Sequence, residues 1–283
     1  MGKKKNFFDE SLESNMETFY LYYNRLKEIA ISRFKWLNLP DSVDPRYLEL
    51  CLFENGNALF FKDSEMGYLT LSDVSNGNFN VYGEPLKRQA YSRYNNYQRR
   101  LNYKNSAYIW NNMLRTGNVL EIQSFAKRLY NLDRIIDVNA NAQKTPVLIL
   151  CDEKERITMK NLYQQFDGNA PVIFGDKALN VQGVQVLKTD APFICDKIYE
   201  LKTQIWNEAL TYLGIPNVAY QKRERLVSDE VTRGLGGTLI SRKSALTMRE
   251  EACRKINKMF GLDISVEFQD CENSDDSEVE SNE

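Results

Sequence analysis

The fold class follows from residues 118–138, which read NVLEIQSFAKRLYNLDRIIDV. Asn118, followed by Glu121 three residues later, is a typical helix start signal. Apolar residues then recur at alternating spacings of three and four, at Ile122, Phe125, Leu129, Leu132 and Ile136. This spacing predicts one apolar face of a helix. About 20 residues at 1.5 Å each give a rod of roughly 30 Å, which needs other helices to cover that face.

Residues 193–214 predict a second long helix of the same kind. Gly214 can cap its end. Its apolar stripe runs through Ile198, Leu201, Ile205, Ala209 and Leu213. Between the two helices the pattern predicts a compact αβ region, with strands at 145–150, 170–174 and 183–187 and a short helix at 158–166. These strands are too few and too short for a Rossmann sheet, so we expect two long helices that flank a small αβ insertion.

The rest of the chain predicts further helices and a few strands. A hairpin with Gly67 in its turn is expected at 57–71, and 75–105 reads as strand and loop. Three glycines between Gly234 and Gly237 predict a mobile loop at 233–246, and Thr247 with Glu250 forms a capping box that opens a new helix. Helices are also expected at 15–37, 217–232 and 247–261, and a last strand at 263–268. The fold class is α+β and predominantly helical.

The composition argues against enzyme chemistry. The sequence has no histidine, which removes His-based triads and most catalytic zinc sites. Its five cysteines show no C-x-x-C spacing and predict reduced thiols. The glycine-rich stretch lacks the G-K-[ST] ending of a phosphate-binding loop, and no D-x-D-x-D-G metal loop is present. We therefore expect no catalytic residues, no metal and no cofactor.

Charge is unevenly distributed. Lys plus Arg total 37 and Asp plus Glu total 39, but residues 270–283 hold seven acidic residues and no basic one. Such a tail is typical of a solvated, disordered end or of an interaction tail. No run approaches the roughly 18 apolar residues of a membrane span, so no membrane partner is expected.

Three sets of basic residues are candidates for nucleic-acid contact. Residues 87–104 interleave six Lys or Arg residues with tyrosines and contain no acidic residue, a pattern that suits either nucleic acid or a protein interface. Lys3, Lys4 and Lys5 form a cationic tip that could bind nucleic acid or keep the terminus solvated. Periodicity alone makes Lys188 and Lys197 ordinary surface lysines.

Five segments in order resemble the portal, or upper collar, protein of small podoviruses with protein-primed linear genomes. They are RFKWLNLPDSVDPRYLE (33–49), VNANAQKTPVLI (138–149), YQQFDGNAPVIF (163–174), VLKTDAPFICDK (186–197) and IWNEALTYLGI (205–215). With SDEVTRG and REEACRKIN included, the likeness covers residues 17–74 and 118–268 well, and residues 75–117 match poorly.

The resemblance implies the portal fold, assembled into a dodecameric ring at the virion's portal vertex, with host cytoplasm as the place of assembly. It divides the chain into a basic N-terminal arm (1–14), a wing (15–117), a stem helix (118–144), an αβ clip (145–192), a second stem helix (193–215), a second wing part (216–268) and an acidic tail (269–283). Such a ring is a late, structural protein that packages, retains and ejects double-stranded DNA.

The resemblance also assigns roles to residues. The family's two rings of channel lysines fall on Lys188 and Lys197, which reverses the periodicity reading, and its channel loop falls on 233–246. In that loop Arg233, Arg242 and Lys243 add charge, beside Gly234, Gly236 and Gly237. Lys3 to Lys5 match an arm that meets the packaging motor. The implied partners are DNA, the major capsid and scaffolding proteins, a packaging ATPase with or without a packaging RNA, and a lower collar or tail protein.

Two other classes stay open at this stage. One is a non-catalytic nucleic-acid-binding protein of small oligomeric state, which would use residues 87–104 and the N-terminal lysines. The other is a nuclease that uses carboxylates and Mg²⁺. A ring of fixed size separates the portal from the first, and DNA cleavage that depends on one Asp or Glu would identify the second.

Overall fold

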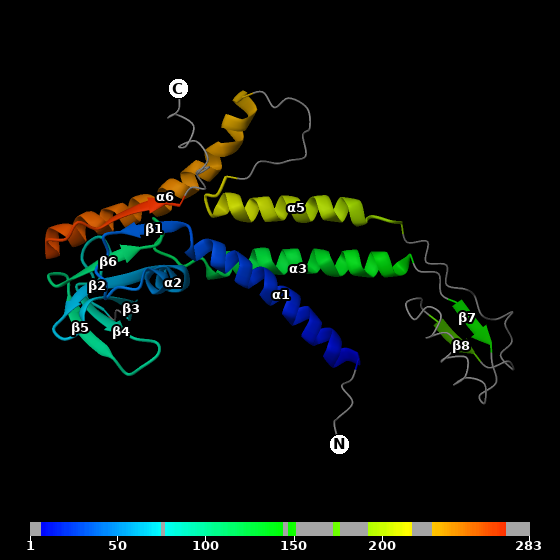
Figure 1. Ribbon diagram of the computed structural model, residues 1–283, viewed down its shortest axis with the longest axis horizontal. Coiled ribbons are helices and arrows are strands. Elements are labelled where there is room, and N and C mark those ends of the chain that lie inside the picture. The colour runs from blue at the N-terminus through cyan, green and yellow to red at the C-terminus, as the bar shows by residue number, and fades with distance from the viewer. Residues whose placement is uncertain are drawn as a thin grey trace, which may run out of the picture. The chain divides into compact units, whose positions relative to one another are not determined.

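The computed structural model describes residues 7–74, 77–143, 147–150, 172–175, 192–216 and 228–269 (Figure 1). The chain divides into two compact units, one of residues 1–127 with 205–283 and the other of residues 128–204. In the described parts of the chain, no helix is long and apolar enough to cross a membrane.

The first unit begins with helix α1 (Phe7–Ile31), which ends earlier than the sequence predicted. The expected helix over 15–37 is wrong at its C-terminal end, because Phe34–Leu37 is strand β1 and pairs antiparallel with β9 (Ser265–Phe268). The strand alternates, with Phe34 and Trp36 buried and Lys35 exposed. Pairing with a strand more than 200 residues away therefore overrides a local pattern that also suits a helix.

Helix α2 (Pro45–Asn55) follows and was not expected from the sequence. Asp44 caps its start by accepting a hydrogen bond from the Arg46 N–H at 2.9 Å, and Pro45 occupies the first turn. Gly56 closes the helix with φ +79°. A Cβ at this position would lie 2.5 Å from the carbonyl carbon of Thr116, so the glycine lets the loop before α3 approach the end of α2.

Five antiparallel strands form the main sheet in the order β5-β4-β3-β2-β6. The hairpin expected around Gly67 is confirmed as β2 (Asn57–Asp63) and β3 (Gly67–Asp73), with Gly67 at φ +80°. The region read as strand and loop contains β4 (Lys87–Tyr91) and β5 (Gln98–Asn102), and β6 (Ser106–Trp110) completes the sheet.

The largest core cluster lies between this sheet, α2, the β1–β9 pair and α6. Phe60, Leu48 and Leu52 are completely buried, and Ile256 of α6 is 1% exposed. Each fully buried side chain of this size contributes about 1.5–3 kcal/mol relative to an exposed one. A smaller cluster around Leu59 and Phe61 occupies the other side of β2, because successive side chains of a strand point to opposite faces.

Helix α6 runs without a break from Ser228 to Phe260. The predicted loop at 233–246 is therefore wrong as secondary structure, and so is the helix start at Thr247. Three glycines cost roughly 1 kcal/mol each in a helix. Packing offsets that cost, since Thr238, Ala245, Ala252 and Ile256 are buried along the same helix. Of the predicted helix over 217–232, residues 217–227 lie outside the described residues.

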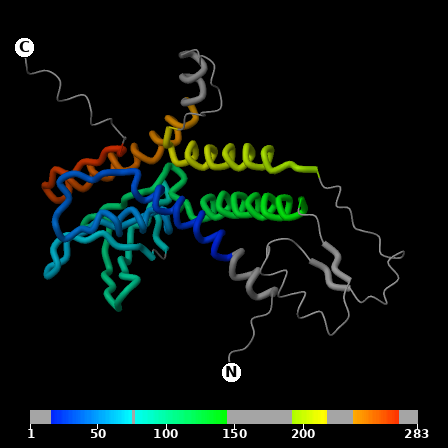
Figure 2. The backbone as a smooth tube through the Cα atoms, turned by 45° about the vertical axis from the view of Figure 1, so that its right-hand side comes forward, coloured from blue at the N-terminus to red at the C-terminus, as the bar shows by residue number. Residues whose placement is uncertain are grey.

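Helices α3 (Val119–Ala142) and α5 (Cys195–Tyr212) confirm the two long helices expected from the sequence. They run side by side in opposite directions in both views (Figures 1 and 2). Strand β7 (Val147–Leu150) pairs parallel with β8 (Val172–Gly175). These are two of the three strands expected in the αβ region between the long helices. The predicted helix at 158–166 and strand at 183–187 lie outside the described residues.

Candidate functional site

The second unit holds the C-terminal part of α3 and the N-terminal part of α5, and this part of α5 carries one of the two predicted channel lysines. Lys197 lies in the first turn of α5 and is exposed to solvent. Asp196 and Glu200 flank it and are also exposed. Lys188, the other predicted channel residue, lies outside the described residues. Lys197 is therefore exposed to solvent on α5, and the channel role of both lysines stays a prediction.

Polar contacts fix the register of this helix pair. The Lys202 ammonium of α5 donates to Asp133 of α3 at 2.6 Å. Near the C-terminal end of α3, the Asn139 amide donates to the Pro192 carbonyl at 3.0 Å, and the Asn139 side-chain oxygen accepts from the Ile194 N–H at 3.1 Å. These contacts hold the first turn of α5, and with it Lys197, at a set position along α3 within this unit.

In the first unit, a buried ion pair lies beneath the start of α3. Arg249 of α6 is completely buried and donates to both carboxylate oxygens of Glu49 at 2.9 and 2.7 Å. Its guanidinium also donates to the Asn111 and Ala245 carbonyls, at 2.9 and 3.0 Å. Trp36 donates to the same Glu49 at 2.9 Å. The pair thus connects α6, α2, β1 and the end of β6, and both charges have several hydrogen-bond partners.

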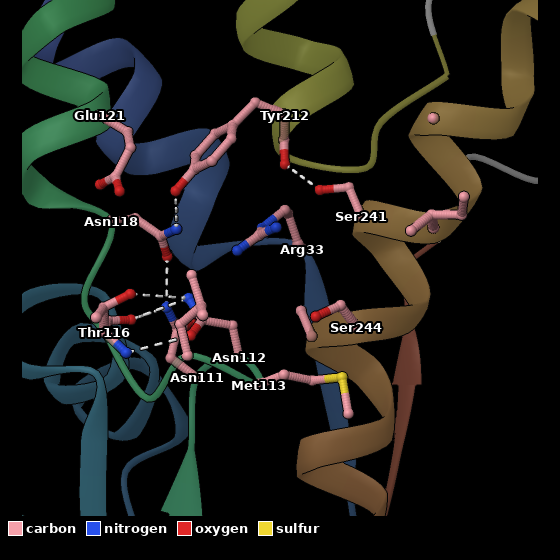
Figure 3. A pocket seen from close by; sticks show the side chains of 14 residues that line it. Arg33, Asn111, Asn112, Met113, Thr116, Asn118, Glu121, Tyr212, Ser241 and Ser244 are labelled. Carbon is pink, nitrogen blue, oxygen red and sulfur yellow. Dashed lines mark hydrogen bonds between the residues drawn. The ribbon is translucent and has the colours of Figure 1, made fainter.

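The network continues from β6 to the two long helices. The Asn111 amide donates to Asn118 Oδ1 at 2.7 Å, and the Asn118 amide donates to the Tyr212 hydroxyl at 2.7 Å (Figure 3). The helix start predicted at Asn118 is confirmed, since the Ile122 N–H donates to the Asn118 carbonyl at 3.0 Å. The Asn118 side chain joins the start of α3 to the end of α5. Burial is the main cause that raises the pKa of Tyr212 above its ordinary value, so the hydroxyl that accepts from Asn118 is neutral at neutral pH.

A cavity of about 350 Å³ opens beside this network and is lined from α3, α5, α6 and the loop after β6. Figure 3 shows Arg33 among its side chains, between Asn118 and Ser244. Arg33 is 6% exposed and donates to the Leu213 and Ala30 carbonyls at 2.7 and 3.0 Å. Burial, and then the charge of Arg249, lower the pKa of Arg33 to about 10. The guanidinium still carries its charge at neutral pH and ties the end of α5 to the end of α1.

The residues predicted for the channel loop lie on α6 and differ in environment. Arg242 is half-buried, donates to the Gly214 carbonyl at 3.1 Å and stacks 3.9 Å over the Phe268 ring. Lys243 and Gly237 are exposed and Gly236 is half-buried. Arg233 and Gly234 lie in the same helix, at backbone positions within α6. Arg242 therefore supports the protein interior, while Lys243 is available to solvent.

The basic stretch of residues 87–104 does not form one cationic surface. Arg88 is buried and donates to the Ser106 carbonyl at 2.5 Å. Arg93 forms an ion pair with Glu54, and Arg99 lies 3.4 Å from Asp63. Exposed cations from this stretch include Lys87, Arg100 and Lys104. Arg88 and Arg99 thus bind residues of the sheet, and Arg93 binds helix α2. Lys3 to Lys5 lie outside the described residues.

The chemistry of the described residues is structural. Over the ranges given above, the side chains include no group of three or more His, Cys, Asp or Glu residues placed to hold a metal ion. Cys51 and Cys253 are buried, and burial is the main cause that raises the pKa of each thiol, to about 11 for Cys253. A thiol with a raised pKa is a poor nucleophile at neutral pH.

The chain combines a long antiparallel helix pair with a mixed helix and sheet body, and comparison with solved structures identifies this as a portal-like fold. The chain aligns over 97% of its length with 94% of a chain in the structure of the portal and tail of native bacteriophage P68, at TM-score 0.52 and 17% identity. It also matches an HK97 family phage portal protein from Corynebacterium diphtheriae at TM-score 0.43 and 11% identity, over 90% of this chain and 93% of that one. A chain in the virion of a native gene transfer agent particle matches at TM-score 0.42 and 12% identity, over 90% and 83%.

The chain belongs to the Phage Connector (GP10) family, whose model matches residues 5–271. It is a structural, non-enzymatic portal, or head-tail connector, protein of the virion. The family resemblance seen in the sequence is confirmed, and so is the prediction that the chain is not an enzyme. Reasoning from the sequence missed the network of Glu49, Arg249, Asn111 and Tyr212, because its members are far apart along the chain and no local motif links them.

Proposed function

We propose that twelve copies of this chain form a closed ring whose axial channel passes double-stranded DNA during packaging, retention and ejection. The observation that carries the proposal is the family match over residues 5–271. The structure adds a long amphipathic helix pair with fixed register and an exposed lysine, as a channel wall requires. In such a ring one surface of each copy contacts a different surface of the next copy. The ring closes when the rotation from one copy to the next is a whole fraction of a full turn.

Lys188 and Lys197 are proposed to face the channel as two cationic rings. Contacts of lysine with phosphate carry no sequence information, so any duplex can pass. Each contact is weakened by salt and exchanges readily, which suits a surface along which DNA slides. The exposure of Lys197 on a helix whose neighbouring exposed residues include Asp196 and Glu200 supports a mixed surface that does not hold DNA tightly.

The part of α6 over residues 233–246 is proposed to line the channel as a helix rather than as a loop. Lys243 would then contribute a further exposed cation, with Arg233 as a candidate neighbour. Lys3, Lys4 and Lys5 are proposed to contact the packaging ATPase, with or without a packaging RNA. The remaining proposed partners are the major capsid and scaffolding proteins at the vertex of a podovirus head and a lower collar or tail protein.

The test is the mass and symmetry of the purified protein, measured by native mass spectrometry and by electron-microscope class averages. We expect a uniform ring of twelve copies with a central hole. A different fixed ring size would keep the channel and correct the copy number. A monomer or dimer that persists at high concentration would contradict the ring and favour the nucleic-acid-binding protein of small oligomeric state.

A further inference from the structure

A short hairpin between β3 and β4 is ordered by one asparagine. The Asn80 side-chain oxygen accepts from the Tyr82 and Glu84 N–H groups at 2.9 and 2.8 Å, and the Asn80 N–H donates to the Glu84 carbonyl at 2.9 Å. The base of the hairpin is fixed as well. Glu84 lies 3.5 Å from Arg115, and Arg88 donates to the Pro85 carbonyl at 3.1 Å. Residues 80–85 are therefore held in one turn conformation by several hydrogen bonds.

Despite this order, the tip of the hairpin presents apolar side chains to solvent. Val81 is 92% exposed, Tyr82 82% and Phe79 56%. Together these three side chains offer on the order of 400 Å² of surface, about half of what one partner contributes to a standard protein interface. An exposed apolar tip on a hydrogen-bonded turn has less backbone entropy to lose on binding than an open loop, which favours its use as an interface anchor.

A cleft of about 450 Å³ lies beside the hairpin, and we name it the hairpin cleft. Its walls include Glu84, Arg88, Tyr103, Lys255, Lys258 and Met259. Lys255 and Lys258 are exposed on α6, and neither forms an ion pair with any residue that the structure describes. The cleft thus combines apolar walls with an excess of positive charge, which favours an acidic partner with an apolar face.

The chain itself carries a segment of that kind. Residues 7–21 of α1 contain four acidic residues and no basic one. Met16 and Tyr20, four residues apart, are 56% and 49% exposed on one face of the helix. Leu21 is 70% exposed on the neighbouring face, four residues after exposed Glu17. Towards its N-terminal end, α1 runs away from the sheet and from α6 (Figure 1). These exposed apolar side chains therefore lack cover from the sheet of their own copy.

We infer that this half of α1 docks into the hairpin cleft of the neighbouring copy, against the tip at Val81 and Tyr82. In this contact, a helix with acidic and exposed apolar side chains lies in a groove with basic residues and apolar walls. A helix bound in a groove is a common mode of recognition. Every copy offers both surfaces, as the two sides of a ring contact require. The inference rests on the proposed ring and deepens it by naming the two surfaces that meet.

Disulfide trapping tests the contact. Met16→Cys, Tyr20→Cys and Leu21→Cys are each combined with Tyr82→Cys, oxidised gently and separated under denaturing conditions. We expect at least one pair to give a ladder of linked copies, at least tenfold above Tyr82→Cys alone, which measures the background from native thiols. Glu28→Cys with Tyr82→Cys is the matched control. Glu28 lies two turns of α1, about 10 Å, beyond Leu21, and in the proposed contact this is too far from Tyr82 for a disulfide.

The same samples separate the two proposals. Intact rings without a ladder would overturn this docking and leave the ring in place, with another partner such as the capsid protein as the occupant of the cleft. A bond formed within single copies would overturn it too. Failure of the unmodified protein to form rings would instead contradict the proposed function, and the docking with it.

A charge exchange supplies a second readout. Lys255→Glu with Lys258→Glu should lower the fraction of protein in rings at least tenfold at low protein concentration. Adding Glu17→Lys should restore a measurable part of it, because the opposite charges are re-established across the contact. Glu28→Lys is the matched control and should restore none. Equal effects of the two α1 variants would contradict the pairing.

Discussion

At the scale of single residues, the pair of Arg249 and Glu49 is the most consequential contact in the first unit. The two residues are 1% and 3% exposed at the side chain and are separated by 200 residues in the chain. Removing one partner of a buried pair leaves the other charge without compensation, at a cost of roughly 3–5 kcal/mol. We expect Arg249→Leu to lower the free energy of unfolding by about this amount, as measured by urea denaturation.

The double variant Glu49→Leu with Arg249→Leu is the control for that prediction. It should be more stable than Arg249→Leu alone, because neither member of the pair is then left buried without the other. If the stability losses of Glu49→Leu and of Arg249→Leu simply add up to the loss of the double variant, the two residues are not coupled through the ion pair.

Asp63 and Tyr97 give the protein an acid dependence. The Tyr97 hydroxyl donates to Asp63 at 2.6 Å and is the main cause that lowers the pKa of Asp63 to about 2. A carboxylate with a lowered pKa stabilises the fold fully above its ordinary pKa, near 4, and this contribution is lost as the pH falls towards 2. We expect Tyr97→Phe to reduce the loss of stability between pH 4 and pH 2.5, as measured by the unfolding temperature.

The unfolding temperature of the wild-type protein should therefore fall further between pH 4 and pH 2.5 than that of Tyr97→Phe. At pH 6 the variant should be the less stable of the two. Parallel curves for both proteins would assign the acid dependence to other carboxylates. The backbone N–H groups of Glu65 and Met66, which also donate to Asp63, remain in the variant, so part of the dependence should persist.

At the scale of elements, the sequence predicts the helices and strands whose formation depends on neighbouring residues. The two long helices and the hairpin at Gly67 agree with the structure because each has its own periodicity and end signals. Helix α2 also had such signals, in Asp44, Pro45 and Gly56, and they were overlooked. Strand β1 and the uninterrupted α6 could not be read locally, since β9 and the sheet, which lie far away in the chain, stabilise them.

The glycines of α6 allow the helix to be tested against the loop that the sequence predicted. Gly236 and Gly237 lie in the helix, and an added Cβ meets no atom within 4 Å at either position. We expect Gly236→Ala and Gly237→Ala to raise the free energy of unfolding by about 0.5–1 kcal/mol each, because alanine is the better helix former. Thermal and urea unfolding followed by circular dichroism measure the change.

Gly214→Ala is the matched control. Gly214 has φ +75°, and an added Cβ would lie 2.7 Å from the Arg242 backbone. This variant should be destabilised, since both the conformation and the space exclude a side chain. Destabilisation by Gly236→Ala and Gly237→Ala as well would indicate that these two positions need glycine conformations and would support the loop.

At the scale of the whole molecule, the sequence identified the class of protein better than it identified the site. Portal identity is spread over segments that match in order along most of the chain, so single errors in helices or loops did not affect it. The cationic stretch at 87–104 shows the limit, because the sequence gives no means to tell buried Arg88, which binds within the sheet, from exposed Lys87 and Arg100. Burial depends on tertiary contacts that charge patterns do not contain.

The channel lysines belong to this largest scale, because their effect requires the assembled ring. Lys197 is exposed, and an exposed side chain away from special features rarely changes stability by more than about 0.5 kcal/mol. We expect the double variant Lys188→Ala with Lys197→Ala to form rings of unchanged mass in native mass spectrometry. DNA retention in packaged particles should change, because two rings of positive charge that contact phosphate are removed.

Raising the salt concentration should mimic the variant in wild-type particles and affect the variant less, since the electrostatic contacts that salt weakens are then already missing. The matched control is Lys87→Ala, which removes an exposed cation of strand β4, outside the residues proposed to line the channel. Loss of the ring in the double variant would assign the two lysines to the contacts between copies, and retention that is unchanged at every salt concentration would remove them from the channel.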